Sequence, residues 1–287
     1  MPYLYLVIAV LCSASGCILC AFYNRKNKDE NDATTLYTVL LLVSNFLCWL
    51  ILFLFDGRFS WAVLPYAFLF ALGYVVTNFV FIQALKVGSV ALTSLILQLS
   101  LIGTTVWGFC FWDAEFTLIV GLAIALVVVA LSLCLYTGKQ EKQPFSAKWL
   151  LLVFIIFVGN ACCLIVQKTQ QLHFDGQYGN CMMFLATGLS AVTACILCFT
   201  QKKNNTKLIL KRSWYFPVLA GSLNAVLNLF VILLATSTLS PNLIYPVLSI
   251  GGLMLTILVS AFIFKEKLRW WQWIGIAVGL MAILLLS

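Results

Sequence analysis

The sequence consists of long apolar runs separated by short polar or charged links. A helix needs about 20 mainly apolar residues to cross the roughly 30 Å hydrocarbon core of a bilayer. Ten runs of about this length follow one another along the chain. They are far too long for the strands of a membrane β-barrel, whose signature is about ten residues of alternating hydrophobicity. The sequence therefore predicts an all-α polytopic membrane protein with ten transmembrane helices.

The composition excludes a water-soluble alternative. Apolar types make up 63% of the chain and charged types 9%, whereas an ordinary soluble domain carries about 25% charged residues. Too few charges remain to cover a water-facing surface, which also argues against a disordered chain, a coiled coil and a nucleic-acid-binding protein. The predicted spans are Tyr3–Tyr23, Thr34–Phe55, Ala62–Leu85, Ser89–Trp112, Phe116–Tyr136, Trp149–Val166, Gly179–Phe199, Trp214–Ala235, Pro241–Phe264 and Trp270–Leu286.

The basic residues predict how these spans are oriented. Fifteen of the 17 lysines and arginines fall in the links on one side, and only Arg58 and Lys168 fall on the other. Because lysine and arginine concentrate on the cytoplasmic side of membrane proteins, both termini are expected outside. We expect an integral protein of the bacterial cytoplasmic membrane, in which the net charge of +8 mainly sets the topology.

The two halves of the chain contain a weak internal repeat. Residues 84–115 align with residues 235–266 at a constant offset of 151, with Ser89/Ser240, Leu97/Leu248 and Glu115/Glu266 among the identical pairs. We divide the chain accordingly into residues 1–138 and 139–287, with five spans each. Because five is odd, the second copy enters the membrane in the opposite sense. Such inverted repeats are typical of secondary transporters, in which the substrate site lies at the midplane between the halves.

Motifs at the ends of the two copies resemble a known family. The first copy carries Ala84-Leu85-Lys86, then Val90-Ala91, and a helix that ends at Glu115; the second closes with Phe264-Lys-Glu266-Lys-Leu and Trp270-Trp-Gln-Trp-Ile-Gly275. This arrangement resembles the EamA-type ten-helix branch of the drug/metabolite transporter (DMT) superfamily. The resemblance implies a carrier of small metabolites, often an exporter, and it implies no particular substrate. Some relatives are thought to keep both termini inside, unlike the orientation predicted here.

No charged side chain is predicted near the middle of a span. All nine carboxylates lie in links or at span ends, whereas a charge at the bilayer centre normally marks an ion or proton pathway. This argues against a carboxylate proton relay. The single histidine, His173, lies in a link, and the 11 cysteines lie in spans where they suit packing. We therefore expect no metal, no cofactor and no catalytic residue.

The spans do contain uncharged polar residues in a symmetric arrangement. Tyr74 and Asn78 are four residues apart and share one face of the third span, and Asn224 and Asn228 occupy the matching positions of the eighth. Facing lipid would be costly for such groups, so these faces should point inward. Any one of them could simply bond a neighbouring helix, but their symmetry favours a cavity. The predicted substrate-binding residues are Tyr74, Asn78, Ser94, Gln98, Asn224, Asn228, Tyr245 and Ser249.

Glycine and proline suggest where the bundle moves and where it packs. Pro246 frees a backbone carbonyl within the ninth span, and with Gly251 and Gly252 it forms a candidate gate, a static kink being the alternative. Gly275-x-x-x-Gly279 and Gly121-x-x-x-Ala125 allow close helix approach. We expect them to join the fifth and tenth spans within one chain, which favours a monomer over a dimer.

These observations together predict a secondary carrier that works by alternating access, not an enzyme. With no charge at mid-depth, its substrate should be a small uncharged, zwitterionic or amphipathic metabolite, such as an amino-acid-like solute, moved by export or exchange. Two alternatives stay open: a lipid-carrier flippase on the same fold, and an intramembrane lipid-modifying enzyme. The expected partners are a small-molecule substrate and the lipid bilayer, without nucleic acid.

Overall fold

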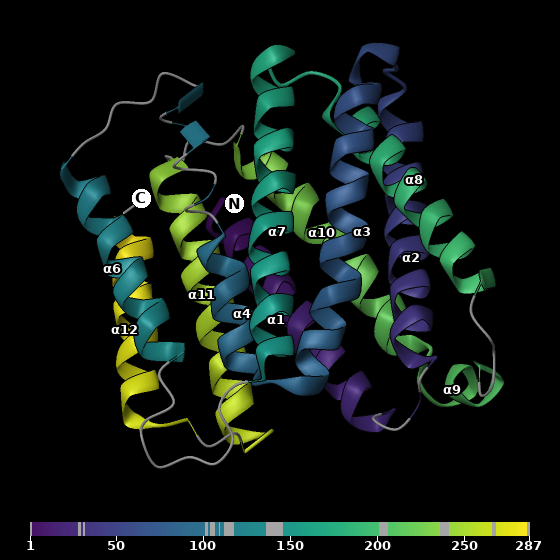
Figure 1. Ribbon diagram of the computed structural model, residues 1–287. Helices are drawn as coiled ribbons and strands as arrows, with labels where there is room; N and C mark the ends of the chain where they lie inside the picture. Colours follow the sequence, from purple (N-terminus) through teal and green to yellow (C-terminus); the bar gives the residue numbers. More distant parts are fainter. Residues whose placement is uncertain are drawn as a thin grey trace.

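A computed structural model of the chain describes residues 2–27, 30, 32–100, 103, 107–108, 110–111, 118–135, 146–200, 206–235, 241–265 and 268–285. Within these ranges every regular element is a helix, which confirms the all-α prediction (Figure 1). The helices are α1 (Pro2–Lys26), α2 (Ala33–Asp56), the 3₁₀ turn η1 (Trp61–Val63), α3 (Leu64–Val87), α4 (Val90–Leu99), α6 (Leu118–Leu135), α7 (Ala147–His173), α8 (Gly179–Thr200), α9 (Thr206–Ser213), α10 (Tyr215–Ala235), α11 (Pro241–Phe262) and α12 (Trp270–Leu285).

The length and apolarity of these helices are those of an integral membrane protein. Five helices in the described part are long and apolar enough to cross a membrane: Tyr3–Lys26, Ala33–Asp56, Trp61–Val87, Ala147–His173 and Gly179–Phe199. A sixth span results if Thr206–Ser213 and Tyr215–Val231, which meet at a bend of 62°, are counted together.

Two helices extend furthest beyond their predicted spans, and one helix was not predicted. α1 continues to Lys26 and α7 to His173, whereas hydropathy placed their ends at Tyr23 and Val166. The reason is that hydropathy marks where lipid ends, while good helix formers such as lysine and glutamine extend a helix into the polar region. α9 lies where only a link was expected, because its alternation of lysine and apolar residues is too short and too polar for a span.

Local signals explain where several helices begin and end. The hydroxyls of Ser89 and Ser146 accept hydrogen bonds from Leu92 N (3.4 Å) and Lys148 N (3.2 Å) at the starts of α4 and α7. Such caps satisfy backbone donors that have no partner inside the helix. α2 ends at Gly57, whose φ of 65° favours glycine and whose N–H donates to Phe53 O.

The main packing joins helices that are far apart in the sequence. α1 packs against α10 and α11, α3 against α7 and α8, and α2 against α8 and α10. α4 lies against α7 and α11, and α6 pairs with α12 at the side of the bundle away from α2 and α8 (Figure 1). The α6–α12 pair is the predicted close contact of Gly279, where an added Cβ would lie 3.5 Å from the Cβ of Ala130.

Contacts at the helix ends fix the direction of these pairs. Lys26, at the end of α1, donates to Arg212 O just before α10, while the ring of Tyr5 near the start of α1 lies 5.3 Å from that of Phe230 near the end of α10. These two helices therefore run antiparallel. The pair α2–α8 is also antiparallel, because Asp56 at the end of α2 accepts a hydrogen bond of 3.1 Å from Asn180 at the start of α8.

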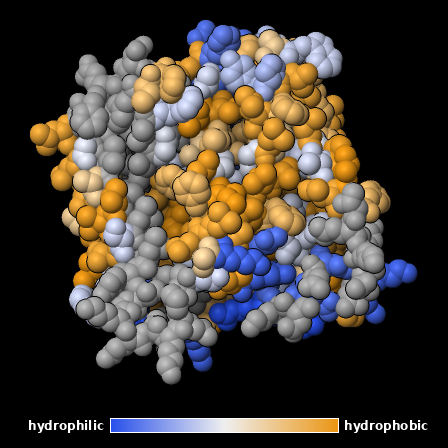
Figure 2. Space-filling model, in the orientation of Figure 1, coloured by the Kyte–Doolittle hydropathy of each residue, from blue (hydrophilic) through white to orange (hydrophobic). Residues whose placement is uncertain are grey.

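The surface is mainly hydrophobic between two more polar edges. Figure 2 shows a broad hydrophobic face and a band of hydrophilic residues at its lower edge, where α9 lies in Figure 1. α1 begins and α12 ends in the upper half of the view, away from this hydrophilic edge (Figure 1). Large apolar side chains on several helices are exposed, as expected for groups that face lipid: Val7, Leu11, Leu69, Leu72, Val192 and Ile196.

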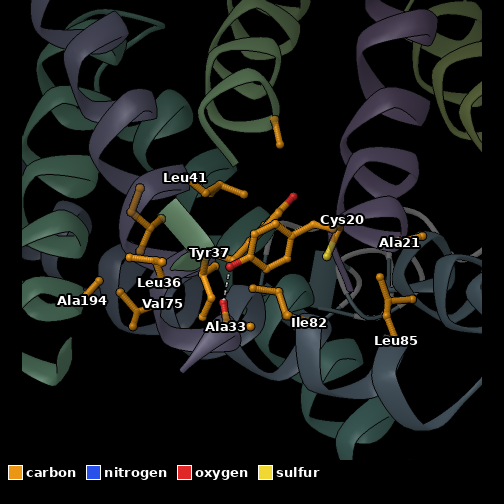
Figure 3. Close-up of a cluster of buried hydrophobic side chains, with 14 of the residues drawn as sticks. Cys20, Ala21, Ala33, Leu36, Tyr37, Leu41, Val75, Ile82, Leu85 and Ala194 are labelled. Carbon is orange, nitrogen blue, oxygen red and sulfur yellow. Dashed lines mark hydrogen bonds between the residues drawn. The ribbon is translucent and has the colours of Figure 1, made fainter. Parts of the chain in front are cut away.

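A buried apolar cluster lies near the lower edge, where α1, α2, α3 and α8 meet (Figure 3). Tyr37 is 1% exposed and packs against Tyr23 at a centroid distance of 4.8 Å. The Tyr23 hydroxyl donates to Ala33 O at 2.9 Å, which ties the end of α1 to the start of α2. The cluster therefore includes the helix ends on this side of the bundle.

Glycine permits the closest helix contacts. A Cβ at Gly221 of α10 would overlap Ser44 Oγ and the carbonyl oxygen of Leu41, both of α2. A Cβ at Gly159 of α7 would overlap Thr77 Oγ1 of α3. Small residues at such crossings let helix backbones approach, which is the main source of helix association in lipid.

We predict that Gly221→Ala will lower the unfolding free energy by about 1–3 kcal/mol, because the new methyl group meets backbone that cannot rotate away. The matched control is Gly16→Ala in α1, where nothing lies within 4 Å of an added Cβ. That change should be neutral or slightly stabilising, since alanine favours helix by about 1 kcal/mol over glycine. Thermal unfolding in detergent measures both, and equal midpoints would contradict the prediction.

Candidate functional site

Four of the predicted site residues lie on interior helix faces. On α3, Leu69, Leu72 and Val76 are 46–56% exposed and mark the outer face. At 3.6 residues per turn, Tyr74 and Asn78 lie on the opposite side of that helix. On α10 the same geometry places Asn224 and Asn228 away from the exposed Leu219 and Leu233. These faces are therefore directed toward the interior of the bundle, and the role of the four residues in substrate binding stays a prediction.

Tyr74 and Asn224, predicted from equivalent positions of the two halves, meet in the interior. The Tyr74 hydroxyl donates to Asn224 Oδ1 at 3.0 Å. This hydrogen bond crosses from α3 to α10, two helices 150 residues apart in the sequence.

Asn45 of α2 completes this contact, and the sequence analysis missed it. Its Nδ2 donates to the Tyr74 hydroxyl at 2.8 Å and to Asn224 Oδ1 at 2.9 Å, and the residue is 0% exposed. We call Asn45, Tyr74 and Asn224 the central triad. Asn45 escaped notice because it has no polar residue one turn away and no polar counterpart at the repeat offset. A lone amide in the middle of the run Thr34–Phe55 was the available signal.

The triad leaves one polar atom without a partner. Asn45 Oδ1 is buried and accepts no hydrogen bond from any described residue. An unsatisfied buried group of this kind costs about 1–3 kcal/mol. A ligand that brings an N–H or O–H donor to this oxygen would recover that free energy.

Asn78 and Asn228 lie one turn beyond the triad, on α3 and α10. Each donates to a carbonyl on its own helix, Asn78 to Tyr74 O and Asn228 to Asn224 O, both at 2.8 Å. Asn228 also reaches Asn224 Oδ1 at 3.2 Å. In the described part neither the Asn78 amide nor the Asn228 amide bonds to another helix. These two side chains therefore do not link helices through the hydrogen bonds described. Both side chains are only partly buried.

Ser94 and Gln98 belong to a second polar group, between α4, α1 and α11. A Cβ at Gly252 would lie 2.7 Å from Ser13 Oγ and 3.7 Å from Gln98 Nε2. Ser94 is 2% exposed on the same face of α4. Ser13 of α1 therefore joins the predicted residues here, and the sequence analysis did not select it.

The candidate gate in α11 is described only in part. The backbone is helical from Pro241 to Phe262, whereas the side chains of Tyr245, Pro246 and Ser249 lie outside the described part of the structure. A Cβ at Gly251 would lie 2.8 Å from Val10 Cγ1. Gly251 and Gly252 thus form the surface on which α11 packs against α1, and their role in gating stays a prediction.

Polar contacts also close the bundle at its lower edge, around the end of α1. Arg25 donates to Phe264 O at 2.9 Å, and its guanidinium lies 4.2 Å from the centre of the Phe264 ring. Asn27 Nδ2 donates to Ser213 Oγ at 3.0 Å. Asn24 Nδ2 reaches Ile82 O at 3.0 Å. We call Asn24, Arg25, Lys26 and Asn27, together with their partners, the basic-side seal. The sequence analysis assigned the charges of Arg25 and Lys26 to topology alone.

Comparison with known proteins adds evidence on the fold only. No family model and no curated protein sequence matches the chain. A protein of known crystal structure matches it over 97% of this chain and 96% of its own, with a TM-score of 0.61 and 10% sequence identity. At that identity the two proteins share an architecture, and nothing about substrate or activity follows.

We predict that Asn45→Leu and Asn224→Leu will be energetically coupled. Each single change leaves a partner unsatisfied, whereas the double change removes both polar groups, so its effect should fall short of the sum by about 0.6–1.7 kcal/mol. The measurement is a double-mutant cycle on the unfolding free energy in detergent.

The control cycle pairs Asn45→Leu with Asn160→Leu, because Asn160 instead bonds Ser100 Oγ at 2.6 Å and shares no partner with Asn45. That pair should be additive. Additivity in both cycles would show that the triad is not a coupled unit.

Proposed function

We propose that the protein is a secondary carrier of the EamA-type DMT branch, built from ten transmembrane spans in two inverted repeats and working by alternating access. The central triad carries this proposal. It brings equivalent helices of the two halves, α3 and α10, together through uncharged polar groups, and it leaves a buried acceptor without a partner.

The helix contacts support the repeat. If the halves are exchanged, α1 corresponds to α7, α2 to α8, α3 to α10, α4 to α11 and α6 to α12. The pair α1–α10 then becomes α7–α3, and the pair α2–α10 becomes α8–α3. The pair α1–α11 becomes α7–α4. Each of these six pairs is in contact. The pairs α2–α8, α4–α11 and α6–α12 map onto themselves and are also in contact. Two-fold exchange is the packing expected of two related halves.

The antiparallel pairing supports inversion of the second copy. α2 and α8 are equivalent under the exchange, and halves with the same orientation would place them parallel. The contact between Asp56 and Asn180 instead joins the end of one to the start of the other. Inverted repeats in carriers place the substrate site between the halves, which is where the triad lies.

The polar groups suggest the class of substrate. Amide and hydroxyl groups of the triad, Asn78, Asn228 and Gln98 can bond N–H, O–H and carbonyl groups without a charge. We infer a small uncharged, zwitterionic or amphipathic metabolite. Its donor would bond Asn45 Oδ1.

The basic-side seal suggests which conformation is observed. Arg25, Asn27 and their partners join α1 to α11 and to the junction of α9 and α10, so the lower edge is held closed. A carrier that opens to that side has to break these contacts. Because the basic helix α9 lies at this edge, while α1 begins and α12 ends in the opposite half of the view (Figure 1), we propose that the sealed side is cytoplasmic and that both termini are outside the cytoplasmic membrane. We propose a monomer as the working unit.

We predict that Gln98→Leu and Asn228→Leu will each lower transport at least tenfold, because a lost substrate hydrogen bond of about 1.4 kcal/mol is a factor of ten. A thermal-shift screen of neutral and zwitterionic metabolites first identifies the substrate; a ligand at 100 times its Kd adds about 2.7 kcal/mol to stability. Transport is then measured in proteoliposomes.

The matched control is Asn180→Leu, which removes an amide at a helix end outside both polar groups. It should retain transport. Full transport by both site variants would remove these residues from the site. If lipid moves between the leaflets while no solute is transported, the protein is a flippase. If the lipid is chemically altered, the protein is an enzyme.

We predict that linking the seal will stop transport. In Asn27→Cys/Ser213→Cys the two thiols replace side chains that are 3.0 Å apart, so oxidation with copper phenanthroline should join them and hold the lower edge closed. Substrate flux should fall to the protein-free rate and return on reduction. The two single-cysteine variants control for the 11 native cysteines. A cross-linked carrier that transports at the normal rate would show that this edge need not open.

A further inference from the structure

A hydrophobic groove runs along the outer surface between α2 and α8. It encloses about 590 Å³ and is lined only by apolar side chains and a glycine. Leu47 of α2 and Val192, Ile196 and Phe199 of α8 line it and are 50–78% exposed, so the groove opens toward lipid. It is separate from the central triad, whose residues do not line it.

Aromatic rings from both helices pack beside a glycine at this groove. Phe184 of α8 stacks on Phe46 and Phe53 of α2, with ring centres 5.6 and 4.6 Å apart. One turn along α8 stands Gly188, where an added Cβ would lie 3.1 Å from Phe46. The rings hold the two helices together, and Phe46 occupies the space that a side chain on Gly188 would need.

The groove has the length of a lipid chain. Its residues on α8 extend from Phe184 to Phe199, about 22 Å at 1.5 Å per residue. One leaflet contributes about half of a hydrocarbon core of roughly 30 Å. The groove is longer than this half, so an extended acyl chain from a single leaflet fits within it.

Positive charge lies at one end of the groove. Phe199 is in the last turn of α8, and α9 begins only a few residues later at Thr206. α9 contacts α2 and buries Ile209, while Lys207, Lys211 and Arg212 are exposed. It lies across the lower, hydrophilic edge of the bundle (Figures 1 and 2). An amphipathic helix with this placement holds its cations at head-group depth.

We propose that the α2–α8 groove and the exposed cations of α9 together form a binding site for an anionic phospholipid. The acyl chain lies in the groove and the phosphate faces Lys207 and Lys211. The apolar groove matches the acyl chain of such a lipid, and the cations at its end match the anionic head group. A zwitterionic lipid with the same chains matches the groove but not the cations. This site does not depend on what the carrier transports.

The test measures lipid binding to the detergent-solubilised full chain by native mass spectrometry. Phosphatidylglycerol is compared with phosphatidylcholine of the same acyl chains and with the chain-free glycerophosphoglycerol head group. We expect phosphatidylglycerol to bind at least tenfold more tightly than either. Equal affinity of the two lipids would indicate nonspecific lipid, and equally tight binding of the head group alone would show that the groove is not used; either result overturns the proposal.

Two pairs of variants separate the parts of the site. Ile196→Trp fills the groove, and Ile51→Trp is its control, because Ile51 is equally exposed at 55% but lies outside the groove. The first should weaken phosphatidylglycerol binding at least fivefold and the second should not. Lys207→Gln and Lys211→Gln should each weaken it about fivefold, whereas Lys148→Gln, exposed on the same side at the start of α7, should have no effect.

The lysine variants keep the test decisive if the tryptophan disturbs folding, because their side chains are at the surface. Unchanged phosphatidylglycerol affinity in both lysine variants, or equal losses in Lys148→Gln, would overturn the proposal.

Discussion

A polar side chain inside a bilayer has no water to bond, so it must find a partner on another helix or on a ligand. This constraint explains the arrangement of the polar interior. Tyr74 and Asn224 satisfy each other across the halves, and Asn45 joins both. Within the triad, the carbonyl oxygen of Asn45 accepts no hydrogen bond from any described residue. The unpaired oxygen of Asn45 is therefore the feature that marks the triad as a candidate ligand site.

The same constraint would ease the movement that we propose for a carrier. Hydrogen bonds between membrane helices average only about 0.6 kcal/mol, so a network such as the triad can exchange partners at low cost when a substrate offers replacements. The contacts that close the lower edge have another character, because Arg25 and Lys26 lie where their charges can reach water. An uncharged centre and a charged seal suit a carrier, since the centre must admit a desolvated solute while the seal can hydrate on opening.

The sequence predicted the helices better than it predicted the site. The run Thr34–Phe55 matches α2 (Ala33–Asp56) closely, because exclusion of polar groups from lipid is a strong, local signal. Symmetry between the halves selected Tyr74 and Asn224, and they do meet. Asn45 was missed because its role arises from the packing of α2 against α3 and α10. The spacing of residues within α2 does not reveal that packing. The end of α7 and the existence of α9 were missed because hydropathy reports the lipid boundary and not helix propensity.

α2 connects the two proposed sites. Asn45 belongs to the central triad, and the next residue, Phe46, lines the groove. Successive residues on a helix point about 100° apart, so a single rigid turn of α2 presents one to the protein interior and the other to lipid. A rotation of α2 that carries Asn45 toward or away from Asn224 must move Phe46 against Phe184, and a lipid chain packed there opposes that rotation. Lipid occupancy and rearrangement of the triad would therefore be linked through α2, with each biasing the other by the same free energy.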